Sequence, residues 1–182
     1  MQGNRAAIAA VLAIVLLAGG WWLYKRGTGP DAVDLIAQLD GATKRPADRT
    51  FTVEDVTLNG ETHRAINAMP PARITWRVTV PEDAWLRVRV GMKPESWTAE
   101  GNGALFFVVV SDDRTSETLF EQFINPFRNE GDRKWVPVMV DLSQYAGEEI
   151  NIIFNTWTGR KGEADDPRND LAVWGAPEII TR

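Results

Sequence analysis

The chain has 182 residues, with 20 Lys and Arg side chains against 25 Asp and Glu. Residues 1–30 hold three of the basic residues and no acidic residue, so the rest carries 17 basic and 25 acidic side chains, a net charge of −8, which disfavours nucleic-acid binding through phosphate neutralisation. The chain has no cysteine, which excludes disulfides, thiolate metal sites and cysteine nucleophiles.

Residues 6–24 form an uncharged, apolar run of 19 residues that is long enough to cross a bilayer as a helix. Two tryptophans and a tyrosine gather at its end, followed by Lys25 and Arg26, a pattern typical of a membrane interface. The run exceeds the usual apolar region of a cleaved secretory signal, which is the alternative. We therefore predict that residues 1–26 are a single-pass transmembrane anchor.

Residues 27–50 follow as a linker that holds a short helix. A Gly- and Pro-containing hinge spans residues 27–30, and Val33, Ile36 and Leu39 then recur at helical spacing after an Asp cap. The folded domain is predicted to begin at residue 51.

From residue 51 the pattern changes to short alternating runs separated by polar turns. A hairpin is expected over 51–66, where Asn59-Gly60 suits a tight turn. Further strands are predicted over 73–80, 84–90, 104–110, 136–142, 150–154 and 171–179. The spacing indicates an all-β fold, an antiparallel β-sandwich over residues 51–182 with Trp76 and Trp174 in its core.

Three motifs in the second half resemble the galactose-binding-like jelly-roll superfamily, in particular its envelope and sulfatase-associated modules. They are Arg133-Lys134-Trp135, Asp141-Leu142-Ser143-Gln144-Tyr145-Ala146-Gly147 and Trp174-Gly175-Ala176-Pro177-Glu178-Ile179. The resemblance covers residues 51–182 and implies a jelly roll. It also favours an extracytoplasmic domain, in the periplasm or at the cell surface, because the flanking basic residues alone do not set the orientation. Many such modules bind glycans, but function does not transfer with the fold.

The sequence offers no catalytic pattern. His63 is the single histidine, and no nucleophile elbow accompanies it. The domain is therefore predicted not to be an enzyme and to need no cofactor, with one exception. The resemblance implies a structural calcium in the acidic loop before the last strand, on Asp165, Asp166 and Asp170, but the loop lacks EF-hand spacing and a solvated acidic loop is the favoured explanation.

A surplus of apolar residues is the basis of the leading functional hypothesis. In a two-layer sandwich the outward positions are expected to be polar, yet several predicted strands are apolar on their second face. We assign this surplus to a partner-binding surface, which consists of Phe106, Val108, Val110, Trp135, Met139, Ile153 and Trp157. The hypothesis is an accessory subunit that binds integral membrane or envelope proteins.

A carbohydrate-binding module of the envelope is the alternative. Its predicted site combines aromatic and basic side chains on a polar strand face, as sugar rings require. The candidate residues are Trp85, Arg87, Arg89 and Trp97, and Trp157 is a further aromatic residue of this kind.

Overall fold

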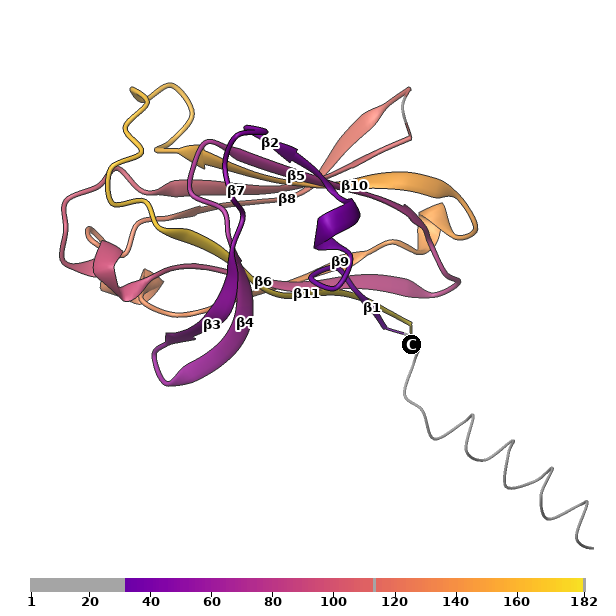
Figure 1. Ribbon diagram of the computed structural model, residues 1–182, viewed down its shortest axis with the longest axis horizontal. Coiled ribbons are helices and arrows are strands. Elements are labelled where there is room, and N and C mark those ends of the chain that lie inside the picture. Colours follow the sequence, from indigo (N-terminus) through magenta and orange to yellow (C-terminus); the bar gives the residue numbers. More distant parts are fainter. Residues whose placement is uncertain (1–31, 113, 182) are drawn as a thin grey trace, which may run out of the picture. The chain divides into compact units, whose positions relative to one another are not determined.

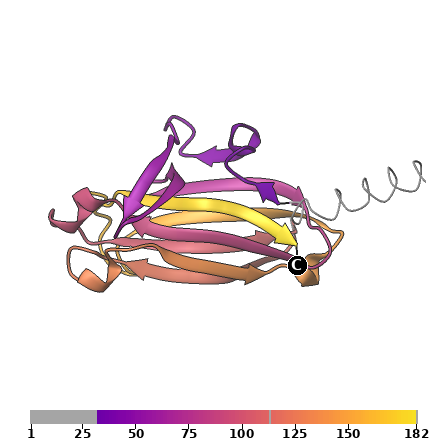
Figure 2. The ribbon, with the colours of Figure 1, turned by 90° about the horizontal axis from the view of Figure 1, so that it is seen from below.

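The computed structural model describes residues 32–112 and 114–181, and its strands form two antiparallel sheets that pack face to face (Figures 1 and 2). The predicted all-β sandwich is therefore confirmed. The strands are β1 (Val33–Asp34), β2 (Thr43–Arg45), β3 (Val53–Leu58), β4 (Glu61–Asn67), β5 (Ala72–Thr79), β6 (Ala84–Met92), β7 (Ala104–Ser111), β8 (Ser116–Ile124), β9 (Val136–Asp141), β10 (Glu149–Thr158) and β11 (Ala172–Thr181). Short 3-10 helices are η1 (Leu39–Gly41), η2 (Pro94–Trp97), η3 (Glu130–Asp132) and η4 (Ser143–Tyr145).

One sheet has the order β3-β4-β11-β6-β9, with β1 also paired to β11, and is called the β11 sheet below. The other has the order β2-β5-β10-β7-β8 and is called the β10 sheet. The alternation in the sequence sets which side chains face inward. In β5, for example, Ile74, Trp76 and Val78 are buried while Arg73 and Arg77 are exposed.

Large aromatic side chains fill the space between the sheets, as predicted for Trp76 and Trp174. Trp174 stacks on Phe154 with ring centroids 4.2 Å apart, and the rings of Trp174 and Phe106 meet edge to face at 5.2 Å. The indole N–H of Trp174 donates to Thr156 Oγ1 at 3.1 Å, so the one polar atom of this ring is satisfied inside the core. These contacts join the two sheets, because Trp174 lies on β11 and Phe154 on β10.

The described part of the predicted linker, residues 32–50, belongs to the sandwich, which corrects the predicted linker and short helix. β1 pairs with β11 and β2 pairs with β5, while Leu35 and Leu39 are buried in the core. The carbonyl oxygen of Leu35 accepts a hydrogen bond from the indole N–H of Trp76 at 3.0 Å. The apolar residues at helical spacing, Val33, Ile36 and Leu39, lie on β1, in a turn and in η1, and they pack against the core.

The predicted membrane anchor, residues 6–24, lies outside the described residues. Within residues 32–112 and 114–181, no helix has the length and hydrophobicity that a membrane span requires.

Candidate functional site

The predicted partner surface is not assembled by the structure. Phe106, Val108 and Val110 point into the core and are at most 2% exposed, so their assignment to an outer face is wrong. The register explains the reversal: Phe106 lies opposite Thr156 and Val108 opposite Phe154, both of which face inward on β10. The sequence of a strand that is apolar on both faces does not indicate which face points into the core. A shift of the alternation by one residue exchanges the two faces.

Trp135 is also buried, but on the other side of the β11 sheet. It is 4% exposed and packs with Val56, Leu58, Ala65 and Val173 in a separate cluster beneath the β3–β4 hairpin. Its indole N–H donates to the carbonyl oxygen of Glu61 at 3.0 Å. The chain's own hairpin therefore covers Trp135, which corrects its prediction as an exposed partner residue.

The remaining three residues of that set lie on opposite sides of the sandwich. Met139 is 47% exposed on the outer side of β9, in the β11 sheet. Ile153 and Trp157 lie on the outer side of β10, and Trp157 is likewise 47% exposed. One continuous patch cannot include all three.

An aromatic and apolar strip does occupy the outer side of the β10 sheet. Trp157 lies opposite Leu105, and Ile153 lies opposite Val109, so these β10 and β7 side chains share one face with Phe107 between them. The Phe107 and Trp157 rings meet edge to face with centroids 5.1 Å apart. We call Trp157, Leu105, Phe107, Val109 and Ile153 the Trp157 face.

Two hollows adjoin the Trp157 ring, and both are lined by Trp157 and Pro71. The larger has a volume of about 430 Å³ and continues along the loop after β10, where Thr158, Lys161, Glu163 and Asp165 line it. The smaller has a volume of about 350 Å³ and lies over β2, β5 and β10. Its polar lining consists of Arg45, Arg73 and Asn155. An exposed indole with hydrogen-bonding groups on both sides is an arrangement that can hold a sugar ring.

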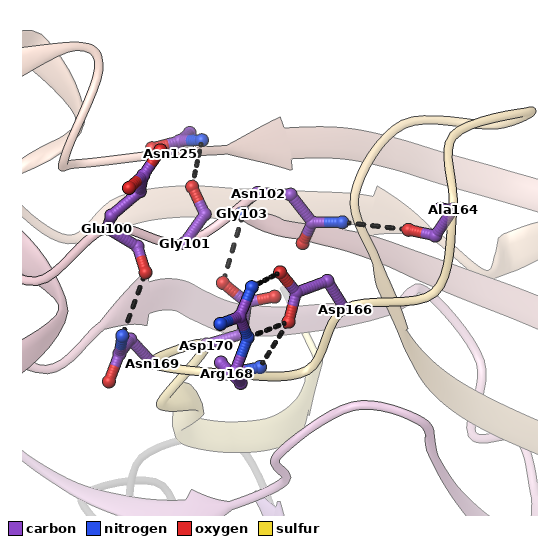
Figure 3. Close-up of polar contacts among 10 residues, drawn as sticks. All are labelled: Glu100, Gly101, Asn102, Gly103, Asn125, Ala164, Asp166, Arg168, Asn169 and Asp170. Atoms are coloured by element: carbon purple, nitrogen blue, oxygen red, sulfur yellow. Dashed lines mark hydrogen bonds and ion pairs between the residues drawn. The ribbon is translucent and has the colours of Figure 1, made fainter.

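Hydrogen bonds hold the loop of residues 159–170 (Figure 3). Residues of this loop line the larger hollow. Asn102 Nδ2 donates to the carbonyl oxygen of Ala164 at 3.0 Å, and Asn169 Nδ2 donates to that of Glu100 at 2.8 Å. Gly159, with φ of +58°, begins the loop, and a Cβ there would lie 2.6 Å from Asn102 Nδ2. Glycine at this position avoids the strain of a positive φ and permits the close approach of Asn102.

The three aspartates predicted as calcium ligands have different partners. Arg168 binds Asp166 through two nitrogens at 2.8 and 2.7 Å, and these bonds lower the pKa of Asp166 to about 2. Asp165 accepts a hydrogen bond from Thr158 Oγ1 at 3.1 Å. Asp170 is fully buried and accepts from the Gly103 N–H at 3.0 Å, and burial raises its pKa to about 7.

These carboxylates do not converge, and across the described residues no three His, Cys, Asp or Glu side chains form a group that could hold a metal. Asp170 Oδ2 and Asn102 Oδ1 are buried and have no hydrogen-bond partner in the described chain. They are oxygens of the kind that calcium prefers, but two side-chain oxygens fall short of the roughly six to eight that it takes. The described side chains by themselves do not make a complete calcium site. The structural calcium therefore stays a prediction.

Of the four residues predicted for sugar binding, Arg87 and Arg89 line one hollow together with Met139, and neither Trp85 nor Trp97 lines it. Arg87 Nε donates to Glu178 at 2.8 Å, and Arg89 lies 3.4 Å from Glu61, so both arginines are neutralised across strands of the β11 sheet. Trp85 is half-buried on the same sheet. Trp97 packs against the cluster beneath the β3–β4 hairpin, and its indole N–H donates to the Met92 carbonyl oxygen at 3.0 Å.

Sequence reasoning recognised Trp157 but missed its polar neighbours. Arg45 falls in the predicted linker, and Arg73 is one of several polar residues on an alternating strand. Asn155 carries no motif, although its position two residues before Trp157 places both on one strand face. Only the pairing of β2, β5 and β10 brings these three residues together.

Comparison with known proteins gives one sequence relative and a set of structural neighbours. No family model matches the chain. An uncharacterized protein of Archaeoglobus fulgidus is 34% identical over 161 residues, which cover 86% of this chain and 37% of that protein. The chain thus spans little more than a third of the length of this curated relative.

The structural neighbours are carbohydrate-binding modules. The CBM51 module of Clostridium perfringens GH95, solved in complex with methyl-galactose, aligns with a TM-score of 0.56 and 16% identity, over 82% of this chain and 99% of that one. The CBM51-2 and INT domains of Clostridium perfringens ZmpB align with a TM-score of 0.54 and 13% identity, over 76% of this chain and 29% of that one. At these identities the likeness shows the fold, a jelly-roll β-sandwich of the type found in carbohydrate-binding modules, consistent with the galactose-binding-like resemblance.

Proposed function

We propose that this domain is a non-catalytic carbohydrate-binding module that binds a glycan on the Trp157 face. The observation that carries the proposal is the exposed Trp157 ring between two hollows with polar linings. An indole plane covers the C–H face of a sugar ring, while nearby amide and charged groups bind its hydroxyls. The sandwich fold shared with carbohydrate-binding modules supports the same function.

The environment of Trp157 suits a rigid binding platform. Phe107 supports the indole from the side, and strand pairing with Leu105 fixes its backbone. Asn155, two residues earlier, is 5% exposed and is hydrogen-bonded to Arg73 Nε at 2.7 Å. Little conformational freedom is therefore lost when a ligand binds, which favours affinity.

The accessory-subunit hypothesis is less well supported. It depends on an exposed apolar surface, but four of the seven residues assigned to that surface are buried by the chain's own sheets and hairpin. The single-pass anchor and extracytoplasmic location remain predictions. Stoichiometric co-purification with an integral membrane protein would support the accessory role.

Glycan binding is tested with the full chain in a detergent that lacks a sugar head group. Immobilised plant and bacterial polysaccharides, including neutral galactans, are screened for retention of the protein. The Trp157→Ala variant is expected to bind at least about tenfold more weakly, a loss of roughly 1.4 kcal/mol. Met139→Ala is the matched control, because Met139 has the same exposed fraction on the opposite sheet.

Two results would contradict glycan binding on the Trp157 face, and a third would contradict the non-catalytic part of the proposal. One is that the wild-type chain is retained on none of the polysaccharides. The other is that binding is unchanged by Trp157→Ala. Turnover of glycoside, ester or sulfate reporters that is lost with a single Asp or Glu substitution would contradict the non-catalytic part.

A further inference from the structure

Two arginines lie directly opposite each other beside Trp157. Arg45 on β2 and Arg73 on β5 are Cα partners in the antiparallel pairing, so their side chains emerge on the same face of the β10 sheet. Both are exposed, and both line the smaller hollow together with Pro46, Pro71, Asn155 and Trp157. No acidic residue lines this hollow.

The absence of a counter-charge is notable on an acidic domain. Several other basic residues of the domain are paired with carboxylates, such as Arg87 with Glu178 and Lys93 with Glu54. Within residues 32–112 and 114–181, neither Arg45 nor Arg73 forms a salt bridge. Like charges directly opposite on neighbouring strands destabilise a sheet. An anionic ligand would remove this cost.

The contact between Arg73 and Asn155 orients one of the two guanidinium groups. Arg73 Nε donates to Asn155 Oδ1 at 2.7 Å, and Asn155 is almost fully buried, so one edge of the guanidinium is fixed. The described chain places no hydrogen-bond acceptor on the terminal nitrogens of Arg73. These N–H groups match the geometry of carboxylate and sulfate oxygens.

We propose that the site takes an anionic glycan, with the sugar ring on Trp157 and its carboxylate or sulfate group bound between Arg45 and Arg73. This inference rests on the proposed glycan-binding function and adds the charge of the ligand. Asn155 and Trp157 are separated by one residue on β10 and lie on the same face, so the two arginines are next to the aromatic platform. An anionic substituent on a ring held by Trp157 therefore meets the guanidinium pair.

The test compares matched polysaccharides that differ in charge. Polygalacturonate is compared with its methyl ester, and a sulfated galactan with its desulfated form, using the full chain in a detergent without a sugar head group. The wild-type chain is expected to bind at least one anionic form about tenfold or more tightly than its neutral partner, with affinity falling as salt is added. The two arms distinguish a uronate carboxylate from a sulfate ester.

Charge variants then locate the effect. Arg45→Gln and Arg73→Gln are each expected to weaken binding of the anionic form more than binding of the neutral form, so that the preference for the anionic form falls about tenfold. Arg64→Gln is the matched control, because Arg64 is exposed on β4 of the other sheet and its loss changes the net charge equally. Arg45→Gln is the more informative variant, since Arg45 is exposed on β2 and its loss leaves the hydrogen bond between Arg73 and Asn155 in place.

The outcomes separate this inference from the proposed function. Equal, Trp157-dependent binding of the anionic and neutral forms would overturn the anionic preference and leave the carbohydrate-binding function standing. If Arg64→Gln reduced the anionic preference as much as Arg45→Gln does, the preference would come from the overall charge of the domain. That result would overturn the proposed arginine site. Failure to bind any of the four polysaccharides, or any other glycan, would overturn both.

Discussion

Replacing Trp174 with alanine tests the packing that joins the two sheets. The Trp174 side chain is fully buried, stacks on Phe154 and meets the Phe106 ring in an edge-to-face arrangement. Removing it leaves a cavity that the surrounding strands cannot fill without losing their pairing. A buried Trp→Ala change of this kind costs roughly 3–5 kcal/mol. The Thr156 hydroxyl also loses its indole partner, which adds about 1 kcal/mol.

The measurement is thermal unfolding of the full chain, monitored by circular dichroism. A loss of this size lowers the thermal midpoint by on the order of 10 °C for a chain of this length. Trp174→Phe keeps an aromatic ring and is expected to lose substantially less. Trp157→Ala is the control, because that side chain is half exposed and its loss leaves the core intact. If Trp174→Ala destabilised the protein no more than Trp157→Ala, the aromatic core described above would not be what holds the sheets together.

Two further predictions concern a close contact and a buried carboxyl group. Gly175→Ala is expected to destabilise the protein by about 1–3 kcal/mol, because its Cβ would lie 2.8 Å from the Trp135 ring, whereas Gly41→Ala, which meets no atom within 4 Å, should have little effect. Equal unfolding midpoints for the two variants would contradict this. Burial raises the pKa of Asp170 to about 7, so its contribution to stability is complete below about pH 4 and is lost as the pH rises toward 7. Between about pH 5 and pH 8, Asp170→Asn should therefore lose less stability than the wild type, and parallel pH profiles of unfolding free energy would argue against a neutral, buried Asp170.

The sequence by itself determined the fold class and much of the core. Strands such as residues 73–80 have one apolar and one polar face. The period-two pattern therefore predicts both that they are strands and which side is buried. Trp76 is assigned to the core in this way, and Trp174 is assigned to it on a largely apolar strand; the structure confirms both. Trp157 could be recognised as an aromatic candidate because it stands at the end of an alternating run.

Only the tertiary structure decided which residues share a surface. β7 is apolar on both faces, so its pairing with β10 decides which face is buried. This pairing places Phe106 inside the sandwich and Phe107 outside. A local sequence pattern also does not predict that a distant segment buries a residue. The β3–β4 hairpin, about 70 residues earlier in the chain, buries Trp135. Arg45 and Arg73 are neighbours only because residues 43–45 add a strand to the β10 sheet. Strand pairing is a non-local interaction, and a periodic pattern along one segment carries no information about its partner.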